Sequence, residues 1–340
     1  MRCLTPGSGG RRQLADMALL EVEGLSIGYR TRLGLHRAVE GVSFSLEEGK
    51  SLGFVGESGC GKTTVGMSLM GLLPRNGEVL RGRVLFEGRD ILSISEEELR
   101  LLRWKKISMI FQAAMNALNP VKKVADQISE AILAHSSSVS KAEASRQVEG
   151  LFQLVGVPKE RMRDYPHQYS GGMKQRAVIA MALACKPRLI IADEPTTALD
   201  VIVQAQILEE TRLLQEQLGI SIIFISHDIS IVADVCHDIG IMYAGELVEY
   251  GSREEVFDSP AHPYTRALLS SFPTLTGNRE MLKPIPGEPP NLVDPPKGCR
   301  FRERCQEASH ECSLISPAWT ELFPRHKVRC IRFERKKGPQ

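Results

Sequence analysis

An eight-residue run near the start of the chain constrains the fold more than any other feature. The segment Gly56–Thr63 reads GESGCGKT and fits the phosphate-loop pattern G-x-x-x-x-G-K-[ST]. The compact apolar run Leu52–Val55 precedes it, and helix-compatible sequence begins near Lys62. Because such a loop belongs between a buried strand and a helix, the run predicts an α/β fold with a parallel-sheet core.

The residue types in this loop suit the binding of nucleotide phosphates. Glycines let the backbone wrap closely around an anion, with successive N–H groups and the helix N-terminus facing it. Lys62 is predicted to bridge the β- and γ-phosphates, and the Thr63 hydroxyl to ligate Mg²⁺. The alternative is a glycine-rich turn that binds nothing. The predicted ATP-binding residues of this segment are Gly56, Ser58, Gly59, Gly61, Lys62, Thr63 and Thr64.

A second apolar run of the buried-strand type ends in two acids. Leu189–Ala192 leads directly into Asp193 and Glu194. An acid at the carboxyl end of a neighbouring parallel strand reaches a phosphate-bound metal, which suits Asp193. The adjacent Glu194 is then placed to polarise the attacking water. A strand ending in Asp-Glu is also common at protein surfaces. The pair therefore indicates a catalytic site only in combination with the phosphate loop.

A third apolar run, Ile222–Ile225, leads into the sequence Ser-His-Asp at 226–228. A single histidine in that position is usually an ordinary loop residue. Ligands of α/β proteins bind where the carboxyl ends of parallel strands meet. The third strand end at one edge therefore makes His227 a candidate sensor of the γ-phosphate.

Composition indicates a folded protein and argues against a membrane-spanning helix. The chain has 340 residues, 42% hydrophobic and 25% charged, close to the average for folded domains. The formal charge of +2 gives no whole-chain argument for nucleic-acid binding. The longest strongly apolar stretches have nine residues, whereas a membrane-spanning helix needs about 20. Residues 1–16 lack the apolar core of a secretory signal and are expected to be a disordered tail, with Met17 as an alternative start.

One segment indicates the family. Residues 167–176 read HQYSGGMKQR, 13 residues ahead of Leu189. Ser-Gly-Gly could be a helix entry capped by Ser170, but with the other motifs it resembles the signature motif of ABC-type ATPases, over residues 18 to about 260. The resemblance implies an α/β ABC-type ATPase domain with a parallel-sheet phosphate-loop core, an antiparallel β subdomain and a helical subdomain. It also implies ATP hydrolysis with ATP and Mg²⁺ as cofactors.

The resemblance implies roles for single residues. Gln112 looks like the Q-loop residue that contacts Mg²⁺ and couples to a transmembrane partner, and Asp200 closes a stretch similar to the D-loop. Tyr29 looks like the aromatic residue that stacks on adenine; a strand-end tyrosine in a half-buried sheet is the alternative. The implied catalytic residues are Glu194, His227 and Gln112, and the implied Mg²⁺ ligands are Thr63, Gln112 and Asp193.

In this family the signature residues, here Ser170, Gly171 and Gly172, act on ATP bound to the opposite subunit. The resemblance therefore implies a second ATPase subunit as partner and favours a paralogue. The family's usual signature reads LSGGQ, whereas this chain has Tyr169 at the first position and Met173 at the last. Met173 removes an amide that could hydrogen-bond, but the backbone donors and Ser170 remain, so activity is expected to persist.

Several short segments are similar to oligopeptide/dipeptide importer ATPases: GESG at 56–59, MNALNP at 115–120, SGGM at 170–173, AHPYT at 261–265 and GCRF at 298–301. This similarity implies an ATPase subunit driving import of di- or oligopeptides, peripheral to the cytoplasmic face of a bacterial cell membrane. The implied partners are two transmembrane permease subunits and, indirectly, an extracytoplasmic peptide-binding protein, with no nucleic acid. An importer of nickel or another small solute, and a soluble ABC ATPase acting on nucleic acid, are the alternatives.

Four of the eight cysteines cluster near the end of the sequence: Cys299, Cys305, Cys312 and Cys330. In a reducing compartment, clustered cysteines favour a metal over disulfides. Their spacing does not fit a zinc finger, and four thiolates suit either Zn²⁺ or an iron–sulfur cluster. The importer resemblance implies a [4Fe-4S] cluster at these four residues. Free thiols, and a tail that senses iron or redox state and gates transport, are the alternatives.

These patterns divide the chain into four parts: the tail 1–16, an ABC ATPase domain 17–258, a proline-rich linker 259–298 and a Cys-rich metal-binding segment 299–340. The last segment is expected to have little core of its own, so metal binding would supply much of its folding free energy. Residues 297–340 carry eleven Lys or Arg against five Glu. That excess indicates either a solvated tail or attraction to anionic lipid headgroups.

Overall fold

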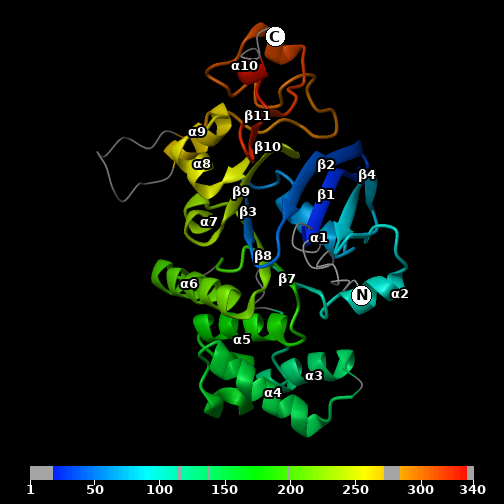
Figure 1. Ribbon diagram of the computed structural model, residues 1–340, viewed down its shortest axis with the longest axis vertical. Helices are drawn as coiled ribbons and strands as arrows, with labels where there is room; N and C mark the ends of the chain where they lie inside the picture. Colours follow the sequence, from blue (N-terminus) through cyan, green and yellow to red (C-terminus); the bar gives the residue numbers. More distant parts are fainter. Residues whose placement is uncertain (1–17, 113–116, 137, 198, 272–283, 335–340) are drawn as a thin grey trace, which may run out of the picture.

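The computed structural model describes residues 18–112, 117–136, 138–197, 199–271 and 284–334. Figure 1 shows an elongated molecule with a group of helices at one end, two sheets in the middle and the C-terminal segment at the other end. Several predicted parts lie outside the described residues: the tail 1–16, Met115 and Asn116 of the MNALNP segment, Ala198 of the D-loop stretch 197–200, residues 272–283 of the linker, and residues 335–340 of the Cys-rich segment.

The larger sheet carries the parallel core. In spatial order its strands are β11 (Thr320–Phe323), β12 (His326–Val328), β10 (Glu246–Ser252), β9 (Asp238–Tyr243), β3 (Ser51–Val55), β8 (Ser221–Ser226), β7 (Leu189–Asp193) and β6 (Ile107–Ile110). The strands from β9 to β6 run parallel, and those from β9 to β11 pair antiparallel. Every residue of β3, β7, β8 and β9 is buried. The three apolar runs thus form the predicted parallel strands, with layers packed on both faces.

The smaller sheet is antiparallel and packs against the larger sheet at β3. Its order is β2 (Gly34–Leu46), β1 (Leu20–Thr31), β4 (Gly77–Phe86) and β5 (Arg89–Asp90). Its inward-facing side chains share one apolar cluster with β3, where the Phe44 and Phe54 rings meet edge to face at 4.9 Å. The antiparallel β part of the predicted architecture is therefore present.

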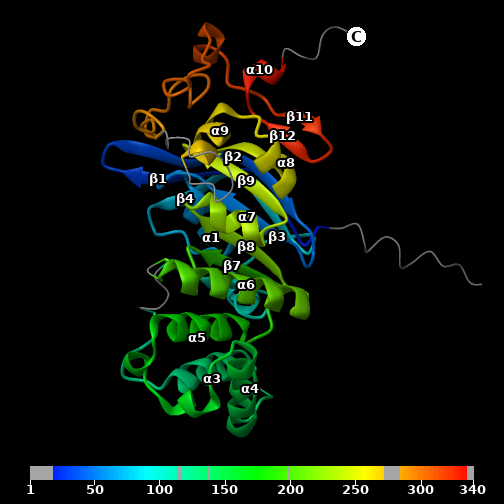
Figure 2. The ribbon, with the colours of Figure 1, turned by 90° about the vertical axis from the view of Figure 1, so that its left-hand side faces the viewer.

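The described part of the chain also forms α-helices. They are α1 (Lys62–Leu69), α2 (Glu96–Leu102), α3 (Val124–His135), α4 (Lys141–Leu154), α5 (Gly171–Leu183), α6 (Val201–Leu218), α7 (Ile229–Val235), α8 (Arg253–Asp258), α9 (Pro263–Ser270) and α10 (Ile331–Glu334). Figures 1 and 2 both place α3, α4 and α5 together at the end opposite the C-terminal segment. This group is the predicted helical part. Within the described ranges, no helix is long and apolar enough to cross a membrane.

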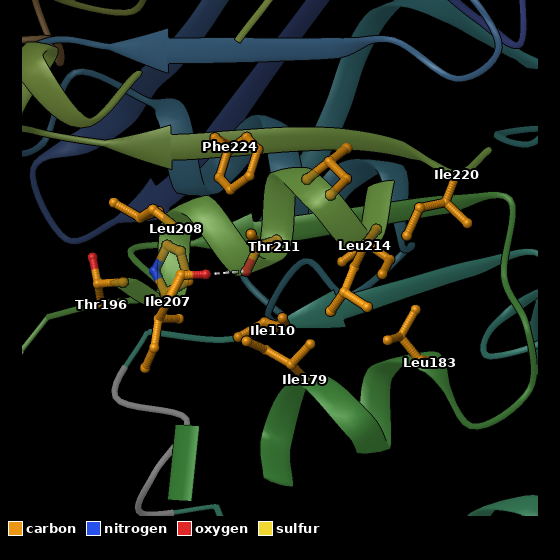
Figure 3. A pocket seen from close by; sticks show the side chains of 14 residues that line it. Ile110, Ile179, Leu183, Thr196, Ile207, Leu208, Thr211, Leu214, Ile220 and Phe224 are labelled. Atoms are coloured by element: carbon orange, nitrogen blue, oxygen red, sulfur yellow. Dashed lines mark hydrogen bonds between the residues drawn. The ribbon is translucent and has the colours of Figure 1, made fainter. Parts of the chain in front are cut away.

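A small apolar cavity of about 20 Å³ lies between the sheet and helices α5 and α6 (Figure 3). Ile179, Leu214 and Phe224 are among the side chains around it. The Thr211 hydroxyl in its wall donates a hydrogen bond to the Ile207 carbonyl, 2.7 Å away. Since its lining is almost entirely apolar, the cavity is a packing space within the core.

The C-terminal segment joins the core sheet. Glu249 and Tyr250 of β10 pair with Val328 and Lys327 of β12, and β11 adds one further strand. Phe301 is buried among core side chains. The segment is therefore stabilised by its pairing with β10 and by the packing of Phe301 on the main core. Its two strands, of three and four residues, are too short to give a periodic signal in the sequence.

The predicted [4Fe-4S] cluster at Cys299, Cys305, Cys312 and Cys330 is wrong, and nothing supports Zn²⁺ there. The four free thiols do line one small cavity. Yet no three His, Cys, Asp or Glu side chains in the described part of the chain are arranged to hold a metal ion. Burial raises the pKa of Cys299 to about 12 and also raises that of Cys305 and Cys330. At neutral pH these three thiols are therefore protonated and pack as weakly polar groups.

Glu249 connects the C-terminal segment to the core by a buried polar cluster. Its carboxylate accepts hydrogen bonds from the Ala261 N–H at 2.7 Å and the His262 N–H at 2.8 Å. It also accepts one from His326 Nε2 at 2.8 Å, and both side chains of this pair are fully buried. One carboxylate thus joins β10, the start of α9 and β12.

Replacing Glu249 with glutamine is expected to lower the free energy of unfolding by about 3 kcal/mol, because an amide leaves buried donors unpaired. Glu254→Gln, which changes an exposed carboxylate on α8, is the matched control and is expected to change it by less than about 0.5 kcal/mol. Urea unfolding followed by circular dichroism measures both. Equal midpoints for the two variants would show that the cluster contributes no stability.

His262 makes stability depend on pH. Burial lowers the pKa of His262 from its ordinary 6.5 to about 4, and its Nδ1 accepts a hydrogen bond from the Tyr264 N–H. The unfolded chain therefore binds a proton more readily, so stability is complete above pH 6.5 and is lost as the pH falls toward 4. Between pH 7.5 and 5 this residue is expected to remove about 2 kcal/mol. Urea unfolding of His262→Gln should show a weaker pH dependence than that of His310→Gln, which changes an exposed histidine.

Candidate nucleotide-hydrolysis site

The phosphate loop connects β3 to α1 through residues 56–61, and two of its glycines are required by close backbone contacts. A Cβ atom at Gly56 would lie 2.0 Å from the Met242 carbonyl oxygen. Gly61 has a φ of +103°, and a Cβ atom there would lie 2.4 Å from the Ala38 carbonyl oxygen. Both glycines therefore let β9 and β2 approach the loop closely.

Lys62 lies folded back over the loop and is only 6% exposed. Its ammonium donates hydrogen bonds to the Gly56 carbonyl at 2.7 Å and the Glu57 carbonyl at 3.0 Å. Ser58 and Gly59, at the middle of the loop, are exposed. A buried cation beneath an exposed loop at the start of a helix is the arrangement that binds phosphate.

The loop side of the core sheet also offers ligands suited to Mg²⁺. The Thr63 hydroxyl donates a hydrogen bond to Asp193 Oδ1 at 3.1 Å. Asp193 is buried at the end of β7, and this burial raises its pKa despite the hydrogen bond from Thr63. A hydroxyl and a carboxylate oxygen are hard ligands of the kind that Mg²⁺ prefers. Close by, the Tyr29 hydroxyl lies 3.0 Å from Thr64 Oγ1.

Glu194 follows Asp193 and is held by three side chains. Its Oε2 accepts hydrogen bonds from Gln112 Nε2 at 2.8 Å and Thr197 Oγ1 at 3.1 Å. His227 Nδ1 lies 3.0 Å from its Oε1. The backbone φ of Glu194 is +46°, a conformation that non-glycine residues rarely adopt and that often marks a functional position.

These contacts set the charge of Glu194. Burial alone would raise its pKa, but the hydrogen bonds from His227 and Thr197 outweigh that effect and hold the pKa below its ordinary value. The carboxylate is therefore ionised at neutral pH. An ionised carboxylate oriented by three neighbours beside a phosphate loop can accept a proton from an attacking water.

The signature residues lie elsewhere, at the start of α5. Ser170 caps this helix, its hydroxyl accepting a hydrogen bond from the Met173 N–H at 3.3 Å. Asp200 caps α6 in the same way through the Val203 N–H at 3.0 Å. The two helix starts adjoin, because a Cβ atom at Gly172 would lie 3.0 Å from Val203 Cγ1. Gly171 and Ser170 are exposed there, at a helix N-terminus able to face an anion.

The structure therefore brings most of the predicted site residues into two contact groups. One joins the loop, Thr63, Thr64, Tyr29 and Asp193, and the other joins Glu194 to Gln112 and His227. Sequence reasoning missed two contributors. One is the hydroxyl of Thr197, which contacts Glu194. The other is the contact of Glu57 with Arg304, which gives no local sequence signal because 247 positions separate the two residues.

Two family profiles match the chain. The one described as "ABC transporter" matches residues 39–197. The one described as "Oligopeptide/dipeptide transporter, C-terminal region" matches residues 248–312.

Relatives with curated names extend over most of the chain. The dipeptide transport ATP-binding protein DppD of Bacillus subtilis is 47% identical over 315 residues, which are 92% of this chain and 94% of that protein. The oligopeptide transport ATP-binding protein OppD of Escherichia coli is 47% identical over 323 residues, which are 94% of this chain and 95% of that protein.

Solved structures share the fold. The structure of cbiO1 from Clostridium perfringens, part of the ABC transporter complex cbiONQ, aligns with a TM-score of 0.62 and 28% identity, covering 71% of this chain and 91% of that one. A dimeric bacterial ABC transporter cassette, MJ0796, aligns with a TM-score of 0.62 and 25% identity, covering 69% of this chain and 98% of that one. The chain is an ABC-type ATPase, and it belongs to the family of ATP-binding subunits of oligopeptide and dipeptide ABC transporters.

Proposed function

We propose that this chain hydrolyses ATP to drive the import of di- or oligopeptides through a membrane ABC transporter. One structural observation carries the hydrolytic part: the Glu194 carboxylate is held between Gln112 and His227, next to the Thr63–Asp193 pair. The peptide substrate rests on the names of DppD and OppD and on the match of residues 248–312 to the transporter C-terminal profile. These favour peptides over nickel or another solute, and over nucleic acid.

Different residues of this chain would bind the phosphates, hold Mg²⁺, orient the general base and accept the proton. The loop backbone and Lys62 hold the phosphates, and Thr63 and Asp193 would hold Mg²⁺, which supplies charge neutralisation on the phosphate oxygens. Gln112, Thr197 and His227 orient the Glu194 carboxylate. Glu194 then takes the proton of the attacking water at one of its oxygens. Tyr29, whose hydroxyl lies 3.0 Å from Thr64 Oγ1, would stack on adenine.

A second ATPase subunit is part of the proposal. The exposed N-terminus of α5, with Ser170, Gly171 and Gly172, would face ATP held by the partner's phosphate loop, and the adjoining Asp200 would lie at the same interface. The dimeric state of the MJ0796 cassette supports this arrangement. The other proposed partners are two permease subunits and, through them, a peptide-binding protein, which would place the chain peripherally at the cytoplasmic face of the membrane. The division into a domain 17–258, a linker 259–298 and a segment 299–340 stays a prediction.

Transport by the assembled complex tests the substrate. In vesicles containing this chain, a partner ATPase and the two permease subunits, uptake of labelled di- or oligopeptide is expected to require ATP and the peptide-binding protein. Labelled nickel in the same vesicles is the control and is expected to stay outside. Uptake of nickel without peptide uptake would overturn the substrate assignment, and tight DNA binding that weakens steeply with salt would favour the nucleic-acid alternative.

A further inference from the structure

The C-terminal segment reaches the phosphate loop through one partly buried ion pair. Arg304 Nη1 lies 2.6 Å from Glu57 Oε2, and Arg304 Nη2 lies 2.7 Å from Glu57 Oε1. Glu57 is the second residue of the phosphate loop, directly after Gly56. The Arg304 side chain is only 5% exposed. Two parallel N–H···O bonds fix orientation as well as distance. We propose that Arg304 is a positioning residue, which holds the start of the phosphate loop in the conformation that binds ATP.

Arg304 is itself held in place. Its Nε donates a hydrogen bond to the Pro286 carbonyl at 2.7 Å. The guanidinium lies over the Tyr243 ring, 5.7 Å from the ring centre, and Nη1 also lies 3.3 Å from the Tyr243 hydroxyl. The Tyr243 ring on the face of the guanidinium and the Pro286 carbonyl at its edge together fix the orientation of this planar group. The fork that meets Glu57 is therefore rigid.

A second contact holds the same loop residue from the same side. The Glu57 N–H donates a hydrogen bond to the Tyr264 hydroxyl at 3.0 Å. Tyr264 lies on α9, is fully buried, and packs its ring against Tyr243 at 4.7 Å and Phe301 at 5.3 Å. Residues beyond β10 therefore hold both the side chain and the backbone N–H of Glu57.

Glu57 passes this restraint to the phosphate-binding lysine. Its carbonyl oxygen accepts a hydrogen bond from Lys62 Nζ, as does the neighbouring Gly56 carbonyl. A loop that is already ordered loses less conformational freedom when a ligand binds. Without Arg304, the partly buried Glu57 carboxylate would be left without its cation, and the loop would relax to expose it to water. The expected consequence is weaker binding of the nucleotide phosphates.

Nucleotide titration of the full chain tests this role, which rests on the proposed phosphate-binding function of residues 56–63. Arg304→Gln is expected to raise the Kd for Mg-ATP about tenfold. Glu57→Gln is expected to raise it similarly, because it leaves Arg304 unpaired. The double variant is expected to bind no more weakly than either single variant, because the two residues act as one pair. Arg302→Gln, which changes a nearby, partly buried arginine that pairs with Glu303 and does not contact the loop, is the matched control and is expected to bind as the unchanged chain does.

The experiment distinguishes failure of the Arg304 role from misfolding of the variant and from failure of the proposed function. An unchanged Kd for a folded Arg304→Gln chain, or single effects that multiply in the double variant, would overturn the positioning role. If Arg304→Gln does not fold, Arg304→Lys keeps the buried charge but loses the two-pronged contact, and it is expected to raise the Kd several-fold. Lys62→Ala, titrated alongside, is expected to bind about 10²-fold more weakly; if it binds normally, the proposed function fails and not only the role of Arg304.

Discussion

Replacing Glu194 with glutamine is expected to reduce the ATP turnover of the assembled transporter by about 10²–10⁴-fold, the usual contribution of a general base. Glutamine keeps the size of the side chain, but a neutral amide cannot take a proton from water. The contacts of Glu194 are with Gln112, Thr197 and His227, and the phosphate loop is held by other residues. Binding of Mg-ATP is therefore expected to stay within a few-fold of its original Kd. Phosphate release and nucleotide titration measure the two effects separately.

Glu216→Gln provides the control, because it changes an exposed glutamate on α6 that pairs with Arg212 at the surface. Its turnover is expected to stay unchanged. Unchanged turnover in Glu194→Gln would mean that Glu194 is not the base. Loss of both binding and turnover would instead indicate that the hydrogen-bonded cluster around Glu194 shapes the loop.

Replacing Lys62 with alanine is expected to weaken Mg-ATP binding about 10²-fold, because two charge-assisted hydrogen bonds to phosphate are lost. The same change removes the hydrogen bonds to the Gly56 and Glu57 carbonyls, so the empty loop loses an internal support as well. Titration with Mg-ATP and thermal unfolding without nucleotide measure these two effects.

The control for Lys62→Ala is Lys141→Ala, at the exposed start of α4. It is expected to bind Mg-ATP with an unchanged Kd. If the two alanine variants bind equally well, Lys62 does not contact phosphate and residues 56–63 are not the nucleotide site.

Local patterns predicted the parts of the fold that depend on local chemistry. The apolar runs before Gly56, Asp193 and His227 became β3, β7 and β8 because continuous apolar sequence is typical of strands buried on both faces. The strands β9 and β10 form a hairpin that turns at Ala244 and Gly245, two adjacent residues of the chain. In each case the residues that determine the structure are neighbours in the sequence.

Contacts between residues far apart in the sequence could not be predicted from local patterns. Four clustered cysteines predicted a metal, but spacing in sequence does not fix how thiols are directed, and these thiols line a cavity with Phe301 and Pro263. The hydrogen bonds of Glu249 to Ala261, His262 and His326 join three separate elements. Glu249 and His326 do not stand out in the sequence, because a buried glutamate and an exposed one look alike until the chain has folded.

The order of strands in the larger sheet has a consequence for how the chain is synthesised. The central strand β3 is made early, yet its neighbours β8 and β9 begin at Ser221 and Asp238, and β10 receives β12 only from His326 onward. Until that last hairpin leaves the ribosome, β10 is an open edge and the Glu249 carboxylate lacks His326. Open edges recruit strands from other chains. Nascent chains interrupted before residue 320 should therefore aggregate, whereas in chains released after β12 that strand covers the edge of β10.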